Sequence, residues 1–239
     1  MAHTGSIGVG ANGTEHVDLL APPDDQTWSR VSELSFVSLS LVDQSHGWGV
    51  SWGQLIGGPG RVLRYTSDGG RSWSDSSSDP CAGDGAPISV SFASARVGWV
   101  ACSGIATNGL SMKSVWKTSD GGNMWALEAA IDPFATPGST PAGSIPGKDY
   151  LSGVAMNAAG AGVMWEALGG ALGTTDGGRT WRSVDPLGAS WASAQAGCIT
   201  NGTTWTLVLL DGAARRQVLE RTSDAGRTWQ RLSAIPLPG

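Results

Sequence analysis

One octapeptide occurs four times along this chain and constrains its fold more than any other feature. Each copy begins with Thr, has Asp at its third position and Gly at its fifth, and ends with Trp. The Asp and Trp positions are Asp68, Trp73, Asp120, Trp125, Asp176, Trp181, Asp224 and Trp229. The segment Asp24-Asp25-Gln26-Thr27-Trp28 is a weaker fifth copy that lacks the glycines.

The spacing of the copies indicates one structural unit per copy. Successive terminal tryptophans lie roughly 45 to 56 residues apart, and a repeat of about that length holds four short strands, which make one propeller blade. The chain has 36 Gly among its 239 residues, and its aromatic residues are 12 Trp against 3 Phe and 2 Tyr. A Trp-bearing unit copied several times accounts for both biases. The sequence therefore predicts an all-β propeller with four-stranded antiparallel blades.

A second pattern sets the register within each repeat. Ser35–Ser38, Ser91–Ser94 and Ser190–Ser193 each begin a repeat and are followed by Gly-Trp or, in the last case, Gly197-Cys198. In the second complete repeat we expect strands near 88–94, 98–103, 114–118 and 124–128, with the octapeptide on the third turn.

The same alignment assigns several residues to the core. Trp48, Trp99 and Trp165 fall on the second strand of their repeats, and Trp191 aligns with Phe36 and Phe92 on the first strand. Cys198 takes the position of Trp99, which predicts a small buried apolar group there.

The boundaries predict a single domain, 1–239, with five blades at approximately 5–31, 32–78, 86–129, 150–185 and 188–234. Ser6–Val9 aligns with a second strand, so the first blade lacks its own first strand. The tail at 232–239 could supply it, although Pro236 and Pro238 weaken that prediction because proline cannot donate to a strand ladder. The alternative is a fragment of a six- or seven-bladed propeller.

The octapeptide resembles the Asp-box, or BNR, repeat of sialidases, sortilin-type receptors, xyloglucanases and photosystem II assembly-factor-like proteins. Its pairing with a Gly-Trp strand is most similar to the assembly-factor-like group. The resemblance covers nearly the whole chain and implies a propeller. It is a weak guide to function, because the motif occurs in enzymes and non-enzymes alike.

Each octapeptide aspartate is expected to tie its own turn by accepting bonds from backbone N–H groups further along the turn. A metal role is disfavoured, because each copy offers one carboxylate whereas Ca²⁺ takes about 6–8 oxygen ligands. The Cys and His residues show no zinc spacing. We therefore predict no metal and no cofactor.

Catalysis is the less favoured interpretation. The resemblance to sialidases would require an arginine cluster, a Tyr–Glu pair and an early Arg-Ile-Pro element. This sequence has no Arg-Ile-Pro element, Tyr65 adjoins an octapeptide at the other end of the blade, and Tyr150 is the only other Tyr. A xyloglucanase-like enzyme needs two carboxylates that flank a cleft. Asp132, Asp149 and Glu166 are candidates, but no spacing pairs them. The prediction is a non-catalytic scaffold that binds a protein or glycan, with a sialidase- or xyloglucanase-like glycoside hydrolase as the alternative.

The net charge limits the classes of partner that the chain can bind, and the cysteine positions indicate its compartment. The net charge is −5 with no Lys or Arg run, which disfavours nucleic acid and anionic lipid. Apolar runs fall short of the ~20 residues that a membrane helix needs, and the first residues do not form a signal peptide. Cys81 lies between two blades and Cys102 at the end of a strand on the same face, so we expect a disulfide. Such a bond would place the protein outside the cytosol, extracytoplasmic or secreted.

The binding face is expected opposite the octapeptide turns, where longer connections gather. The longest runs from Ala130 to Tyr150, and we expect it to overhang the channel mouth. The candidate ligand-binding residues are Phe134, Lys148, Asp149, Tyr150, Asn108, Trp52 and Trp116.

Overall fold

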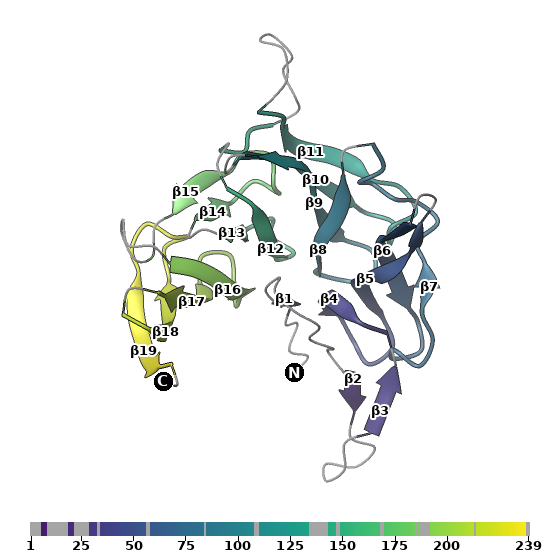
Figure 1. Ribbon diagram of the computed structural model, residues 1–239, viewed down its shortest axis with the longest axis horizontal. Coiled ribbons are helices and arrows are strands. Elements are labelled where there is room, and N and C mark those ends of the chain that lie inside the picture. The colour runs from purple at the N-terminus through teal and green to yellow at the C-terminus, as the bar shows by residue number, and fades with distance from the viewer. Residues whose placement is uncertain are drawn as a thin grey trace.

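The chain folds as an all-β propeller whose sheets fan around a common axis (Figure 1). The computed structural model describes residues 6–8, 19–21, 29–32, 34–55, 58–83, 85–107, 110–133, 143–146, 149–167, 170–184, 186, 192–212 and 214–237. Within these ranges the regular elements are strands, and no helix long and apolar enough to cross a membrane occurs among them.

Four sheets each contain four consecutive antiparallel strands. Sheet 1 contains β4 (Phe36–Leu41), β5 (Gly47–Leu55), β6 (Gly58–Thr66) and β7 (Ser74–Asp75). Sheet 2 contains β8 (Ala86–Phe92), β9 (Gly98–Thr107), β10 (Leu110–Thr118) and β11 (Ala126–Ile131). Sheet 3 contains β12 (Leu151–Met156), β13 (Gly162–Glu166), β14 (Ala171–Thr174) and β15 (Arg182–Val184). Sheet 4 contains β16 (Ala192–Ile199), β17 (Trp205–Asp211), β18 (Arg216–Thr222) and β19 (Gln230–Pro236).

The glycines that begin three second strands are required by close packing. Gly47, Gly98 and Gly162 each pair with the Thr that begins the octapeptide of the same sheet. A Cβ on Gly98 would lie 2.4 Å from the ring of Phe92, and one on Gly47 would lie 2.5 Å from Leu41. Glycine at the start of the second strand therefore leaves room for the side chain that ends the first strand of the same sheet.

The core lies in the seams between neighbouring sheets rather than inside any one sheet. Three buried clusters fill the three seams from sheet 1 to sheet 4. In the first seam, the ring of Trp48 stacks on Phe92 with centroids 3.8 Å apart. In the second, the indole N–H of Trp99 donates to the carbonyl of Gly177 at 2.9 Å. Large aromatic rings thus bind each sheet to the octapeptide side of the next.

The two ends of the chain depart from the expected first blade. The later part of the expected blade 5–31 contains a separate hairpin of β2 (Leu19–Ala21) and β3 (Ser29–Ser32). The segment expected as a second strand instead forms β1 (Ser6–Gly8), which pairs antiparallel with the inner strand β4. The tail is not an inner strand, because Gln230–Pro236 forms the outer strand of sheet 4.

The predicted position of Cys198 is wrong. Cys198 lies on the first strand of sheet 4, not the second, and its side chain is exposed. The second strand begins instead at Trp205, which is fully buried. A longer first strand, with an irregularity between Ala194 and Ala196, displaces the turn and breaks the gap-free alignment. Trp165 is buried on its second strand as expected, whereas Trp191 and Trp28 lie outside the described residues.

Candidate functional site

The four octapeptides form near-identical turns between the third and fourth strands of their sheets. In the first turn, the Thr66 hydroxyl donates to Asp68 Oδ1 at 2.8 Å and accepts the N–H of Gly70 at 2.9 Å. The other carboxylate oxygen of Asp68 accepts the Ser72 hydroxyl at 2.6 Å. Both small residues at the centre of this turn have positive φ, which glycine adopts without a Cβ clash. In the fourth turn, Ala225 adopts this conformation at φ 59°.

These hydrogen bonds lower the pKa values of the octapeptide aspartates. The Ser72 hydroxyl is the main reason that the pKa of Asp68 falls to about 2. The Thr228 hydroxyl lowers the pKa of Asp224 in the same way, and the Met124 N–H that of Asp120. The carboxylates are thus charged acceptors that hold their own turns, and they lie in four different sheets.

The octapeptide turns share one face with the turns between first and second strands. In every sheet the N–H of the octapeptide's fourth residue donates to a carbonyl of that neighbouring turn. These bonds are Gly69 to Ser45, Gly121 to Arg96, Gly177 to Gly160 and Ala225 to Thr203, at 2.8 to 2.9 Å. This face, the octapeptide face, is consequently built from short turns that are tied in pairs.

Serine side chains connect the inner strands of sheets 1, 2 and 3 around the axis. The hydroxyls of Ser38 and Ser40 accept the N–H groups of Val90 and Phe92 on β8, at 3.1 and 2.8 Å. One seam further on, Ser89 and Ser91 accept the N–H groups of Val154 and Met156 on β12, at 3.2 and 2.9 Å. Sequence reasoning missed these roles, although the Ser-x-Ser spacing on two inner strands was a visible signal.

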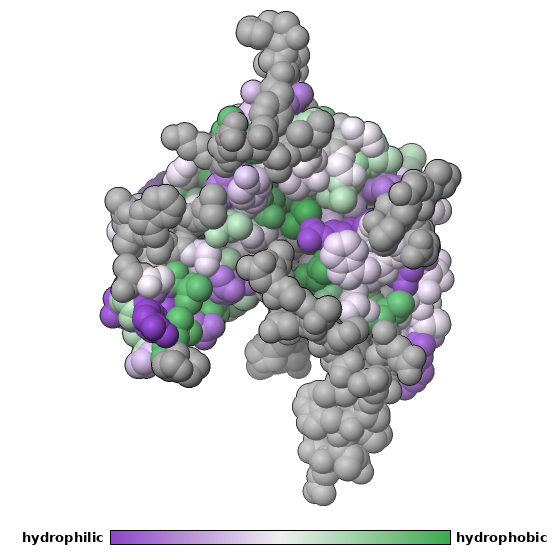
Figure 2. Space-filling model, viewed as in Figure 1, coloured by the Kyte–Doolittle hydropathy of each residue, from purple (hydrophilic) through white to green (hydrophobic). Residues whose placement is uncertain are grey.

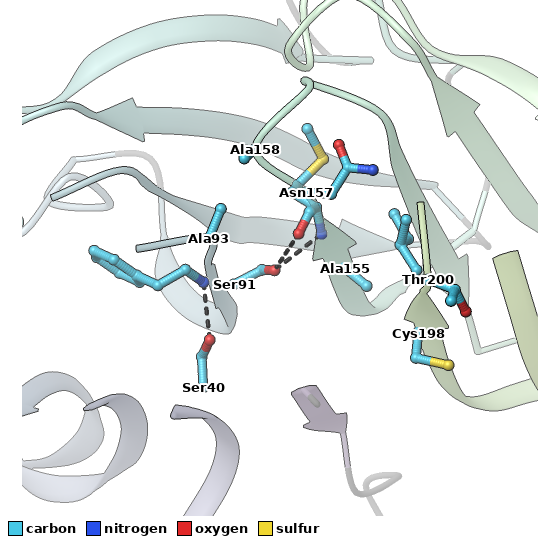
Figure 3. A pocket seen from close by; sticks show the side chains of 11 residues that line it. Ser40, Ser91, Ala93, Ala155, Asn157, Ala158, Cys198 and Thr200 are labelled. Carbon is cyan, nitrogen blue, oxygen red and sulfur yellow. Dashed lines mark hydrogen bonds between the residues drawn. The ribbon is translucent and has the colours of Figure 1, made fainter. Parts of the chain in front are cut away.

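A pocket of about 180 Å³ opens on the axis at the octapeptide end of the inner strands (Figure 3). Ser40, Ser91, Asn157, Cys198 and Thr200 line it from four different sheets. Figure 2 shows hydrophobic surface close to the axis, next to hydrophilic patches. The pocket is smaller than the roughly 300–1,000 Å³ of typical small-molecule sites, so it suits one side chain better than a sugar unit.

The opposite face presents an exposed aromatic residue on sheet 1. Trp52 lies on β5 near its hairpin with β6, and 54% of its surface is exposed. The guanidinium of its cross-strand partner Arg61 lies 5.5 Å from the indole centroid, as in a cation–π pair. Burial lowers the pKa of Arg61. Tyr65, the other exposed aromatic residue described on this sheet, lies at the octapeptide end.

The other candidate residues that the structure describes are not brought together with Trp52. Trp116 is half-buried against the seam between sheets 1 and 2, and its indole N–H donates to the Ser114 hydroxyl at 2.9 Å. Asp149 and Tyr150 lie at the seam between sheets 2 and 3, where the Ser111 hydroxyl donates to the Asp149 carbonyl. Phe134, Lys148 and Asn108 lie outside the described residues.

The long connection from Ala130 to Tyr150 was expected on the face opposite the octapeptide turns, but part of it lies on the octapeptide face. Ser144 pairs with Thr180 in a parallel bridge on the octapeptide face, and its N–H donates to the Arg179 carbonyl at 2.9 Å. Ile145 is buried among the core residues of the second seam. Segment 143–146 is therefore a strap that fills the seam between sheets 2 and 3.

A buried ion pair lies in the same seam towards the opposite face. The ammonium of Lys113 on β10 donates to a carboxylate oxygen of Glu166 on β13, and both side chains are almost completely buried. Burial raises the pKa of Glu166 to about 7, Lys113 opposes this rise, and the negative charge of Asp149 adds to it. Of the three carboxylates that the sequence could not pair, Glu166 is thus bound to a lysine, and Asp149 is near enough for its charge to act on Glu166.

A disulfide joins Cys81 and Cys102, whose Cα atoms lie 5.6 Å apart. Both residues are completely buried in the first seam, beside Val50 of β5 and Val90 of β8. The bond fixes the connection between sheets 1 and 2 to the middle of β9 in sheet 2, because β9 continues past Cys102 to Thr107.

Comparisons with known proteins support the fold. No family model matches the chain, and no curated protein matches it. Among solved structures, a GH74 xyloglucanase from Xanthomonas campestris is similar with a TM-score of 0.51 and 18% identity over 79% of this chain. The chain spans 28% of that enzyme.

Two further solved structures resemble the chain more distantly. YCF48 bound to D1 peptide has a TM-score of 0.42 and 17% identity, over 81% of this chain and 80% of YCF48. A Hadza microbial sialidase has a TM-score of 0.48 and 13% identity, over 82% of this chain and 45% of the sialidase. The similarity to the xyloglucanase, at 18% identity, supports the architecture alone, and the sheets themselves agree with it: the chain is a β-propeller.

Proposed function

We propose that this chain is a non-catalytic Asp-box propeller that binds a protein or glycan partner on the face opposite the octapeptide turns. The exposed Trp52, with Arg61 beside its ring, is the observation that carries the proposal. Trp and Arg are enriched among the residues that dominate protein interfaces. An exposed indole also offers a flat apolar surface to a sugar ring or side chain.

The disulfide and the buried core of the first seam pack beneath the part of β5 that carries Trp52 and make it rigid. Val50, two residues before Trp52 on the same face of β5, packs in the cluster that contains Cys81 and Cys102. A rigid base lowers the entropy lost when the surface binds a partner. A disulfide is also typical of oxidising compartments, which supports an extracytoplasmic location.

Two matched aromatic substitutions test which face binds. The purified protein would be screened on a glycan array and on an array of tiled peptides, and every hit would be remeasured with variants. Trp52→Ala should weaken binding at least tenfold. Tyr65→Ala, at the octapeptide end of the same sheet, should leave affinity unchanged. Loss of binding in the Tyr65 variant alone would place the binding site on the octapeptide face and contradict the proposal.

A glycoside hydrolase is the second candidate, and the raised pKa of Glu166, to which the charge of Asp149 contributes, is what favours it. A carboxyl group whose pKa is near 7 beside a second carboxylate resembles the acid of a glycosidase. Against this role, Lys113 bonds Glu166 and the side chain is almost completely buried. A panel of fluorogenic glycosides tests the activity. Turnover that disappears in Glu166→Gln would replace the binding proposal with the hydrolase.

A further inference from the structure

The axis-facing edge of β4 pairs with the short strand β1, whereas the same edge of β8 and β12 bonds serine side chains. Each inner strand bonds its second strand along one edge and turns its other edge towards the axis. On β8 and β12, serine hydroxyls from the preceding inner strand accept N–H groups of this edge. On β4, the short strand β1 takes that place through backbone pairing.

The registers show that the two arrangements are equivalent. Leu39, Val90 and Val154 pair with Gly49, Val100 and Met164, two residues along from the glycines that begin the second strands. They therefore occupy the same position on their inner strands. Val90 and Val154 meet serine hydroxyls, whereas Leu39 pairs with Ile7 of β1.

β1 also lies between the first and last inner strands. It contacts β16 and β12 as well as β4, and Figure 1 shows it in the middle of the fan. Its three residues, Ser6, Ile7 and Gly8, pair with Ser40, Leu39 and Ser38. The segment thus enters the axis as a single added strand that runs antiparallel to β4.

We propose that the axis-facing edge of β4 is a binding site for an extended peptide, and that β1 occupies this site as an intramolecular ligand. The partner is a polypeptide segment with small residues on either side of a branched aliphatic residue, as in Ser6-Ile7-Gly8. Its main-chain N–H and C=O groups pair with β4 by strand addition. Small residues are required because the inner strands of four sheets surround the axis.

The axial pocket provides a second point of recognition. Ser6 pairs with Ser40, and Ser40 lines the pocket at the octapeptide end. A peptide bound in the register of β1 would extend past Ser40 into the pocket, where Asn157 and Thr200 offer polar groups. This site is separate from the Trp52 surface, so either proposal can fail without the other.

The test compares full-length proteins in which β1 is released or locked. Ile7→Pro removes a donor and disfavours strand pairing. Ile7→Cys with Leu39→Cys, in a Cys198→Ser background, places two cysteines at directly paired positions. Their Cα atoms are about 4.5–5.5 Å apart, within the range that a disulfide bridges. Ala11→Pro, outside the paired segment, is the matched control for the proline.

The probe is a fluorescein-labelled peptide with the sequence of residues 2–10, followed by fluorescence anisotropy. Ile7→Pro protein should bind it at least tenfold more tightly than the unsubstituted protein or Ala11→Pro. The double-cysteine protein should bind it when reduced and lose binding when oxidised. A peptide with Pro in place of its Ile should not bind. Equal binding by oxidised and reduced protein, or by both peptides, would overturn the proposal even if Ile7→Pro proved unstable.

Discussion

Met124 is a residue at which one octapeptide differs from the other three. Ser72, Thr180 and Thr228 occupy the equivalent position, and each hydroxyl donates to the second carboxylate oxygen of its aspartate at 2.5 to 2.7 Å. Met124 cannot donate in this way, and 73% of its surface is exposed. The second turn therefore lacks a hydrogen bond that the other three turns contain.

Replacing Met124 with Thr should restore this hydrogen bond to Asp120 and raise the melting temperature by roughly 2–4 °C. Met124→Val is the matched control, because valine has the shape of threonine without the hydroxyl. Differential scanning calorimetry of the two variants measures the difference. Equal melting temperatures would show that the hydroxyl contributes nothing to this turn.

Asp176→Asn should destabilise the protein and make its stability less sensitive to acid. Burial raises the pKa of Asp176, but hydrogen bonds from Thr180 and Thr174 outweigh it, so the folded pKa lies below 3.8. The carboxylate therefore stabilises the fold above about pH 4, and this stabilisation is lost as the pH falls through the folded pKa. Losing a charge-assisted bond costs about 1.5–3 kcal/mol.

Urea unfolding at pH 7, 4 and 2.5 tests the prediction for Asp176. The gap between unsubstituted protein and Asp176→Asn should be largest at pH 7 and shrink at pH 2.5. A gap that stays constant with pH would mean that the charge of Asp176 is not the stabilising feature. Binding to any partner of the opposite face should be retained in the variant.

At the scale of elements, the connection between sheets 2 and 3 contributes more to the fold than its sequence indicated. Prolines and irregular composition predicted a loop, but no pattern marked Ile145 as core or Ser144 as a partner of Thr180. Those contacts join segments that are distant in sequence. The strands themselves were predictable, because alternation and the octapeptides are local signals.

Lys113 and Glu166 show the same limit for the candidate site. A lysine within a strand is visible in the sequence, but its partner lies 53 positions away on another sheet. Lys113→Met should destabilise the protein by about 3–5 kcal/mol, because it leaves a buried carboxylate without its partner. Lys113→Met with Glu166→Met should recover most of that loss.

Chemical unfolding of the single and double variants provides the measurement for this pair. Similar stability of the single variant and the unsubstituted protein would argue that Lys113 does not compensate the charge of Glu166. A double variant no more stable than the single one would show that the ion pair also positions the strands.

At the scale of the whole molecule, the disulfide limits the motion of the unfolded chain. Cys81 and Cys102 are 21 positions apart, and closing a loop of that length stabilises a protein by about 3 kcal/mol in the chain-entropy model. Replacing both cysteines by serine should lower unfolding free energy by a similar amount, measured against Cys198→Ser as the control. A loss below about 1 kcal/mol would contradict this contribution.

The sequence predicted the propeller and the order of its strands because the octapeptide repeats in phase. It could not predict that Ser6–Gly8 pairs with β4, since three residues carry no periodicity and the pairing is non-local. The misplacement of Cys198 has a similar origin, because an irregular strand shifts the register without changing the residue types that the alignment compared.

The serine bonds between inner strands are distributed unequally around the fan. β12 carries Gly153 and Ala155 where β8 carries Ser89 and Ser91, so no hydroxyl at those positions can bond β16. Sheets 2 and 3 are further joined by the strap and the buried ion pair. Partial unfolding should therefore begin with sheet 4, while sheets 2 and 3 open together. Native-state hydrogen exchange would reveal this order as faster exchange of amides in β17 and β18 than in β9 and β13.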